Sequence, residues 1–432
     1  SLSLSLSRAR RLASMYKLRM FDRERISCSP PHCEGWLRRN VTGVSHRAVA
    51  REGAAASIVL LQNNGSLLPL TTAAAKPYTI AVLGGAAEAK VFDANLPGGG
   101  WCTNRQGQPG GDITCGGDYY SGGGSGHVTP AVYSTPLDGI KNRASFGPST
   151  VTVKSHSTGS SNKLDAENLA LAKAADVTIV FCGASTGESA DRQSLSLDAD
   201  CDRFISAVAK VAQHVVVLVM APGAFLTPWR SEVSTIAAMF LGGQETGGAW
   251  ADVVFGDVSP GGRLPIELPA TEADTIEPNP APSVPYTEGL QTSYRNTTAT
   301  RAYPFGHGLS FSTFLWSDVS STSCPTATPA LEFCLTVTVT NTGLHPATDT
   351  PQLYLEFPPE AGHPRSILKG FQKTPLLEPM ISATVAFNLT ARDLSYYVPQ
   401  SKSWVKAAVA KVSYELSKSS EEVVMRGTLG EL

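Results

Sequence analysis

The sequence predicts an α/β domain, a three-layer α/β/α sandwich with a mostly parallel sheet, followed by a smaller all-β sandwich. Two observations predict this fold class. Short apolar runs, typical of buried strands, alternate with helical segments over the first two thirds of the chain. From Phe314 onward the pattern changes to apolar and polar residues in alternation, separated by turn signals, which indicates a small β-sandwich.

Composition narrows the class of protein. The 432 residues are 42% hydrophobic and 17% charged, which is typical of a globular protein with about two or three domains. A formal net charge of −2 argues against a nucleic-acid-binding surface. No apolar run reaches the length of about 18 residues that a membrane-spanning helix needs. We expect no cofactor, no nucleic-acid partner and no membrane partner.

The cysteines and glycosylation sequons favour a secreted, oxidised protein. Eight cysteines fall into four neighbouring pairs, Cys28/Cys33, Cys102/Cys115, Cys182/Cys201 and Cys324/Cys334. Because none forms a C-x-x-C motif, we expect no zinc site and no other metal. Spacing leaves the connectivity open, and pairing of sequence neighbours is the arrangement we prefer. Acceptor sequons occur at Asn40, Asn64, Asn296 and Asn388.

The first elements are helical and lead into a buried strand. The chain opens without an initiator Met or the apolar core of a signal peptide, so we expect a fragment or a processed piece. Residues 8–26 predict one amphipathic helix. Residues 46–70 predict an alanine-rich helix with a continuous apolar end, then a turn at Asn-Asn-Gly and a stop at Pro69. Residues 79–87 predict a buried strand and a glycine turn. This turn lacks the G-x-G-x-x-G spacing of a dinucleotide-binding site. Its glycines are better explained by the close approach of the next helix to the sheet.

A long glycine-rich loop follows, from Gly98 to Gly126. Loops of this length without periodicity are usually functional or disordered. Its aromatic residues, Trp101, Tyr119 and Tyr120, are candidates for stacking on the apolar face of a sugar ring.

The centre of the chain contains the main candidate for chemistry. Residues 150–153 predict a strand, residues 164–175 a helix, and Val177 to Cys182 a buried strand. The polar loop after that strand carries Glu188, and a carboxyl group at the C-terminal edge of a strand is where open α/β folds place their chemistry. A glutamate on a polar loop is also commonly just solvated. Asp191 and Arg192 are expected to form an ion pair that shapes this loop.

A helix is expected from about Asp198, where carboxylates interact favourably with the N-terminal helix dipole; the aspartates concerned are Asp198, Asp200 and Asp202. Strands at 215–220 and 236–240 complete the sheet. Residues 270–300, rich in Pro, Thr, Glu and Asn, predict an irregular linker. In the β-sandwich, the expected strands lie within residues 335–343, 353–355 and 385–389. His307, in the segment YPFGHGLSF, is expected to pack or to form a hydrogen bond.

Several of these segments resemble glycoside hydrolase family three, the β-glucosidase and β-xylosidase family. Thr186-Gly187-Glu188 and the run from Asp191 to Leu197 resemble its S-G-E-x…D-R-x-x-L-x-L loop, with a shorter spacing than in many fungal members. The longest match is TGGAWADVVFGD followed by PGGRLP, and residues 46–70 resemble the entry into the family's second domain. ILKGF and RDLS resemble its fibronectin type III-like C-terminal domain. Residues 8–26 resemble the last helix of its barrel.

The resemblance implies a domain division and a catalytic role. Residues 1–45 would be a barrel remnant and linker, 46–269 the α/β domain, 270–313 an irregular linker and 314–432 the fibronectin type III-like sandwich. Glu188 would be the general acid/base of a retaining glycosidase, protonated through partial burial. The family's nucleophile is an aspartate on the barrel in an S-D-W-type motif, which this sequence lacks. The chain would therefore be the C-terminal part of a secreted β-glucosidase-like hydrolase acting on terminal β-linked sugars, inactive alone, with the barrel domain as its partner.

Three hypotheses remain from the sequence. The first is the C-terminal part of a β-glucosidase-like hydrolase, with β-xylosidase specificity as the alternative. The second is a carbohydrate-binding or scaffold protein that has lost catalysis; a polar surface where a barrel would dock favours it, and an apolar one favours the first. The third, a nucleotide-binding α/β protein, is disfavoured by the absence of phosphate-binding fingerprints.

Overall fold

A computed structural model of the chain describes residues 12–17, 41–70, 77–88, 119–123, 128, 130, 132–146, 151–156, 161–187, 192–279, 281–324 and 331–429. Residues 1–46 and 47–432 form two separate compact units. Of the predicted helix at 8–26, residues 12–17 are described and are helical. In the parts of the chain that are described, no helix is both long and apolar enough to cross a bilayer.

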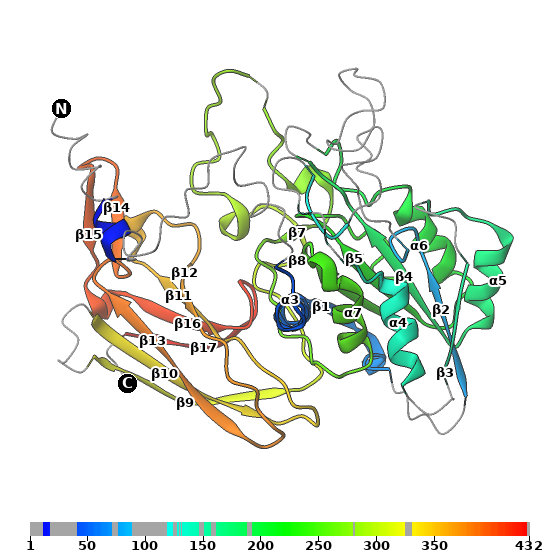
Figure 1. The fold of residues 1–432 in the computed structure, drawn as a ribbon. Helices are drawn as coiled ribbons and strands as arrows, with labels where there is room; N and C mark the ends of the chain where they lie inside the picture. The colour runs from blue at the N-terminus through cyan, green and yellow to red at the C-terminus, as the bar shows by residue number, and fades with distance from the viewer. Residues whose placement is uncertain are drawn as a thin grey trace. The chain divides into compact units, whose positions relative to one another are not determined.

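The α/β domain is built on a six-stranded sheet (Figure 1). In spatial order its strands are β1 (Val59–Asn63), β6 (Thr235–Met239), β5 (Val215–Met220), β4 (Val177–Gly183), β2 (Tyr78–Leu83) and β3 (Val151–Ser155). All neighbouring strands are parallel except the edge strand β1, which runs antiparallel to β6. The predicted mostly parallel sheet is confirmed. Strand β1 was not predicted, because its apolar residues directly follow the helix and lack a turn signal before them.

Helices cover both faces of this sheet. They are α3 (Val44–Ser57), α4 (Pro136–Ser145), α5 (Ala166–Ala174), α6 (Cys201–Ala209) and α7 (Thr246–Val254). Leu137 of α4 and Trp250 of α7 pack in the core on one face, whereas Phe204 of α6 and Trp229 pack in the core on the other. Strands β4 and β5 are buried along their whole length, because both of their faces are covered. The three-layer arrangement is confirmed.

Ion pairs hold α3 against α7 and the turn that precedes α7. Arg47 Nε donates to Glu245 Oε1 at 2.6 Å, and Arg51 Nε donates to Asp252 Oδ2 at 2.7 Å. Because the two arginines are four residues apart, they lie on the same side of α3. The predicted alanine-rich helix is thus held on the α/β domain by charge as well as by its buried Ala54 and Ala55.

The C-terminal part is an all-β sandwich of antiparallel strands, as predicted. One sheet contains β13 (Ser382–Thr390), β10 (Leu331–Asn341) and β9 (Phe314–Ser323); the other contains β12 (Ile367–Phe371), β11 (Gln352–Glu356), β16 (Ser413–Ser417) and β17 (Val423–Thr428). A separate hairpin is formed by β14 (Ser395–Val398) and β15 (Ser403–Lys406). In β10, buried and partly exposed residues alternate, because only one face of the strand meets the core. The predicted disulfide Cys324–Cys334 is present.

Short elements lie between the two domains and in the loops within them. Strand β7 (Leu268–Pro269) pairs with β8 (Arg301–Tyr303), and single 3₁₀ turns fill several loops. These turns are η1 (Asn64–Ser66), η2 (Gly243–Glu245), η3 (Glu272–Asp274), η4 (Ser293–Arg295), η5 (Pro359–Ala361) and η6 (Val409–Lys411). Partly buried Arg263 pairs with buried Asp349 at 2.9 Å and thereby joins the α/β domain to the sandwich. His307 packs on the ring of Tyr303, and its Nε2 lies 2.9 Å from the carbonyl oxygen of Leu61, so this residue both packs and forms a hydrogen bond.

Candidate functional site

The candidate site lies at the carboxyl edge of the parallel sheet, beyond the end of β4. β4 lies between β5 and β2, so the segment that leaves it emerges near the middle of the edge. Residues 184–187 and 192–200 of this segment are described. Glu188 and Asp191 lie outside the described residues, as does Trp101. Their predicted roles therefore stay predictions.

The end of the glycine-rich loop lies beside this segment. Gly123 forms a parallel bridge with Gly187, and its amide donates to the carbonyl oxygen of Thr186 at 2.9 Å. Residues that are far apart in the sequence are thus brought together one position before Glu188. The predicted sugar-contact loop and the predicted acid/base loop are neighbours at this point, which their separate sequence patterns did not indicate.

The two described tyrosines of the glycine-rich loop are buried. Tyr119 packs against Gly183, the last residue of β4, where no side chain larger than hydrogen fits beside its ring. Burial raises the pKa of Tyr119 well above its ordinary value, so its phenol stays neutral. Tyr120 is 2% exposed and packs on Tyr133 with ring centroids 4.5 Å apart. Direct contact of either ring with a sugar stays a prediction.

A hollow of about 330 Å³ opens next to these residues. Its wall includes Tyr120, Ser121, Gly122, Leu241, Gly243 and Gln244. The amide of Gly243 donates to the carbonyl oxygen of Tyr120 at 3.0 Å, which joins the segment after β6 to the glycine-rich loop. This volume is at the small end of the range for ligand pockets. The hollow lies at the same sheet edge as Gly187.

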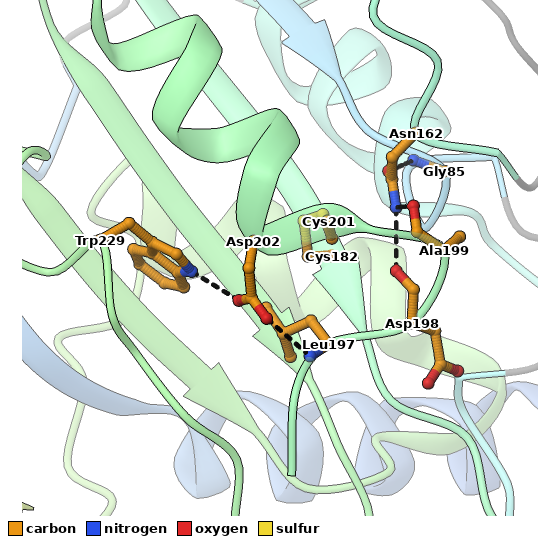
Figure 2. Close-up of a disulfide and its surroundings, with 9 residues drawn as sticks. All are labelled: Gly85, Asn162, Cys182, Leu197, Asp198, Ala199, Cys201, Asp202 and Trp229. Carbon is orange, nitrogen blue, oxygen red and sulfur yellow. Dashed lines mark hydrogen bonds between the residues drawn. A yellow bond between two sulfur atoms is a disulfide. The ribbon is translucent and has the colours of Figure 1, made fainter. Parts of the chain in front are cut away.

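Asp198 closes the base of the segment after β4. Its carboxylate accepts hydrogen bonds from the amide and the hydroxyl of Ser185, at 2.8 and 2.7 Å, and its own amide donates to the carbonyl oxygen of Gly183. Burial raises the pKa of Asp198, and the two Ser185 hydrogen bonds oppose that change. Asn162 donates to the carbonyl oxygens of Asp198 and Ala199, both at 3.1 Å (Figure 2). Asp198 was predicted as a helix-start residue; it lies before the helix and binds Ser185 instead.

The predicted disulfide Cys182–Cys201 joins the end of β4 to the first residue of α6 (Figure 2). The segment that carries Glu188 is therefore a closed loop. Asp202, in the first turn of α6 as predicted, accepts hydrogen bonds from Trp229 Nε1 at 2.7 Å and from the amide of Leu197 at 3.1 Å. The predicted pairs Cys28/Cys33 and Cys102/Cys115 lie outside the described residues.

Arg192 and Glu272 hold the second half of this loop. The guanidinium of Arg192 donates to the carbonyl oxygens of Ala224 and Ser196, at 2.7 and 3.0 Å. Burial lowers the pKa of Arg192, and Asp198 is the first of the nearby carboxylates that oppose this. Glu272 accepts from the hydroxyl of Ser194 at 2.5 Å and from the amide of Leu195 at 2.7 Å, and the Ser194 hydrogen bond is the main cause of its lowered pKa. Sequence reasoning missed Glu272, because nothing local links a residue in an irregular linker to a loop 77 positions earlier.

The glycine turn after β2 is occupied by protein groups. The amide of Gly85 donates to Asn162 Oδ1 at 2.7 Å, and a Cβ on Gly84 would collide with the backbone of Phe181 in the adjacent strand. Gly84 also has a φ of +97°, which favours glycine. The turn therefore permits close packing against β4, in agreement with the structural interpretation of its sequence.

Comparison with known proteins gives two family matches. Residues 58–311 match the model of the glycosyl hydrolase family 3 C-terminal domain, and residues 349–417 match that of a fibronectin type III-like domain. Thermostable beta-glucosidase B of Acetivibrio thermocellus is 30% identical over 396 residues, which cover 88% of this chain and 48% of that protein. An exo-alpha-(1->6)-L-arabinopyranosidase of Bifidobacterium longum is 33% identical over 404 residues, which cover 88% of this chain and 48% of that protein. The chain thus spans about half the length of the curated relatives it matches.

Solved structures show the same relationship. Beta-glucosidase D2-BGL from Chaetomella raphigera superposes with a TM-score of 0.76 at 28% identity, over 89% of this chain and 55% of that one. Beta-D-glucoside glucohydrolase from Trichoderma reesei superposes with a TM-score of 0.76 at 29% identity, over 90% of this chain and 56% of that one.

Proposed function

Because this chain belongs to glycosyl hydrolase family 3, we propose that it is the C-terminal part of a secreted, retaining β-glucosidase-like hydrolase that releases terminal β-linked sugars. Glu188 acts as its general acid/base. The aspartate nucleophile belongs to a barrel domain outside this chain, so the chain alone does not turn over glycosides. Residues 46–269 form the domain that carries the acid/base loop, and residues 314–432 the fibronectin type III-like domain.

One observation carries the proposal: Gly123 bridges Gly187 at the carboxyl edge of the sheet, beside the hollow lined by Tyr120 and Gln244. Gly187, the residue directly before Glu188, lies where open α/β folds bind ligands. A general acid must reach the departing oxygen from a fixed position, since misplacement lowers the rate steeply. The disulfide Cys182–Cys201 and the Asp198–Ser185 hydrogen bonds supply that fixation on one side of the loop.

The mechanism divides two carboxyl groups between two domains. In retaining glycosidases they lie about 5 to 5.5 Å apart; one attacks the sugar and the other protonates the leaving oxygen. Glu188 gives its proton as the glycosidic bond breaks and then removes a proton from the water that releases the sugar. Partial burial against the docked barrel keeps Glu188 protonated before the first step. Asp191 and Arg192 shape the loop without touching substrate.

The substrate is proposed from the relatives. Three of the proteins described above are named as β-glucosidases or as a β-D-glucoside glucohydrolase, so β-glucosides come first. The arabinopyranosidase relative requires that pentopyranosides, including β-xylosides, be included among the substrates tested. Trp101, Tyr119 and Tyr120 belong to the proposed sugar-contact loop.

Secretion is part of the same proposal. Within the described residues two disulfides are present, and Asn64 and Asn388 are exposed within acceptor sequons. Expression in a secretory host should give a protein that loses mass on treatment with an N-glycosidase. Asn64→Gln and Asn388→Gln should each remove one increment of mass. A secreted product of unmodified mass would contradict glycosylation at these positions.

The test of catalysis combines this chain with a barrel domain, in one polypeptide or as two chains. An aryl β-glucoside should be hydrolysed by the combination and by neither part alone. Glu188→Ala should abolish most of that activity, and azide should restore turnover with formation of the glycosyl azide. Binding of glycosides without hydrolysis in every combination would favour the carbohydrate-binding alternative.

A further inference from the structure

The strands β14 and β15 form a hairpin (Figure 1). It carries two aromatic residues that the proposed active site does not use. Tyr397 and Trp404 are directly opposite each other in its antiparallel register. Their rings pack edge to face, with centroids 5.7 Å apart and planes at 65°. Trp404 is 63% exposed and Tyr397 is 44% exposed.

The alternation of side chains in the hairpin separates an anchoring face from this aromatic face. Tyr396 and Val405, the neighbouring cross-strand pair, point to the opposite side. Tyr396 packs edge to face on Phe357 of the sandwich, with centroids 6.0 Å apart. Beyond the hairpin the ladder continues to buried Leu394 and Ala407, which are joined by a hydrogen bond of 2.9 Å. Tyr396 and the Leu394–Ala407 hydrogen bond thus attach the hairpin to the sandwich, although Val405 on the same face stays 37% exposed, and the other face carries Tyr397 and Trp404.

Polar groups border the two rings. Lys406, two residues from Trp404 and on the same face, forms an ion pair with Glu332. Both partners are partly exposed, with 47% and 30% of their side-chain surface accessible. The hairpin turn adds Gln400, Ser401 and Lys402, all exposed. The rings therefore form a small apolar surface surrounded by hydrogen-bonding side chains.

This combination fits a pyranose better than a protein. A sugar ring has an apolar C–H face that covers one aromatic ring, and hydroxyl groups around its edge that need donors and acceptors. A standard protein interface buries about 800 Å² on each partner and has an extended apolar core, whereas Trp404 and Tyr397 are bordered by charged and hydroxyl side chains. The edge-to-face contact holds the Trp404 ring before a ligand arrives, which lowers the entropic cost of binding.

We infer that Trp404 and Tyr397 form a surface binding site for β-linked glycan chains, separate from the catalytic loop. Trp404 stacks on one sugar. Tyr397 supports the Trp404 ring by its edge-to-face contact and offers its hydroxyl to the neighbouring sugar. The Lys406–Glu332 pair contacts hydroxyl groups of the sugar rings. The choice of β-glucan as the glycan rests on the proposed function; the site itself does not. Such a site holds the protein on a polymeric substrate while chain ends are cleaved elsewhere.

The inference is tested with the full 432-residue chain and two probes, amorphous β-1,4-glucan in a sedimentation assay and soluble mixed-linkage β-glucan in affinity electrophoresis. Trp404→Ala should weaken binding about tenfold, as loss of a central aromatic contact does elsewhere. Tyr397→Ala should weaken it less, and Trp404→Phe should restore part of the binding. Phe371→Ala is the matched control, because Phe371 is an exposed aromatic residue on β12 of the same sandwich, 65% exposed; it should bind as the unmodified chain does.

The outcomes separate this site from the catalytic proposal. In the barrel-complemented protein, Trp404→Ala should leave hydrolysis of a small aryl β-glucoside unchanged and slow hydrolysis of the polymer. Glucan binding that survives Trp404→Ala, or an intact chain that neither sediments nor is retarded, overturns the inference. A change in oligomeric state or in barrel binding caused by Trp404→Ala, without a change in glucan binding, also overturns it in favour of a protein interface. If glucan binding depends on Trp404 while Glu188→Ala leaves activity intact, the inference stands and the proposed function fails.

Discussion

The carboxylate of Asp198 accepts both the amide and the hydroxyl hydrogen of Ser185, at 2.8 and 2.7 Å. Ser185 lies two residues after the end of β4, and Asp198 lies three residues before α6 begins. The Asp198 side chain therefore connects the two ends of the loop through hydrogen bonds. The disulfide Cys182–Cys201 connects them as well. The loop proposed to carry the acid is held at its base by two independent connections.

Removal of the Asp198 carboxylate should destabilise the α/β domain. Asp198→Ala leaves the partly buried Ser185 amide without its acceptor, which costs about 1 to 3 kcal/mol in unfolding free energy. Asp198→Asn keeps one acceptor and should cost less. Asp200→Asn is the control, since the exposed Asp200 side chain makes a 3.6 Å pair with Arg203 and asparagine tolerates the left-handed backbone at this position. It should change stability by less than about 0.5 kcal/mol. Equal stability of the Asp198→Ala and Asp200→Asn proteins in denaturant titrations would show that the Asp198 carboxylate does not stabilise the loop.

Asp349 forms one of the polar contacts between the two domains. This buried carboxylate accepts from Arg263 at 2.9 Å and from Trp316 Nε1 at 2.7 Å. Asp349→Ala leaves the largely buried guanidinium of Arg263 without its carboxylate and the buried indole N–H of Trp316 unpaired, so it should cost about 3 to 5 kcal/mol. Glu422→Ala removes an exposed carboxylate paired with Lys418 and should cost less than about 1 kcal/mol. Calorimetry checks both; a small effect of Asp349→Ala would mean that water or a shifted side chain replaces the carboxylate.

Two helices of the α/β domain cross at glycines. A Cβ on Gly139 of α4 would collide with the backbone of Gly247 in α7, so Gly139→Ala must separate the helices and should lower the thermal midpoint markedly. Gly53 of α3 has no atom within 4 Å of the position of an added Cβ. Gly53→Ala should therefore stabilise the protein by about 0.5 to 1 kcal/mol through helix propensity. The same Gly→Ala substitution should therefore lower the thermal midpoint at Gly139 and raise it at Gly53. Thermal unfolding of the two variants tests this directly.

His307 should make stability depend on pH. Burial lowers its pKa below the ordinary value of 6.5; the hydrogen bond to the Leu61 carbonyl opposes this change, Arg263 adds to it and Glu422 opposes it. Since the unfolded chain then takes up the proton first, the stabilisation is complete above pH 6.5 and is lost as the pH falls through the lowered pKa. His307→Phe keeps packing on Tyr303 and should flatten this decline, while replacement of the exposed His214 by Gln controls for loss of a histidine elsewhere. A decline that persists unchanged in His307→Phe excludes His307 as its source.

The sequence predicted elements wherever a local pattern was strong. The apolar runs at 177–182 and 215–220 became β4 and β5, because a strand buried on both faces needs an unbroken apolar sequence. The alternation at 335–343 became part of β10, with the apolar residues buried. Cys182 and Cys324 pair with the neighbours expected for them.

Contacts between distant segments were not predictable in this way. Two such contacts form where separate loops meet at one edge of the sheet. One is the hydrogen bond from the Leu195 amide to Glu272, and the other is the pairing of Gly123 with Gly187. Asp198 was misassigned because an aspartate near a helix start usually serves the helix dipole, whereas here the chain turns through positive φ at Ala199 and Asp200 before the helix begins. The supporting residues of the site are therefore a finding of the fold.

The most direct test of the account is the azide rescue of Glu188→Ala in the barrel-complemented protein. If Glu188 is the general acid/base, we expect a large loss of kcat on an aryl β-glucoside with a poor leaving group and a smaller loss with an activated one. Azide should restore turnover and yield the β-glucosyl azide. Full activity of Glu188→Ala without azide, on both glucosides, would contradict the assignment of Glu188 as the general acid/base.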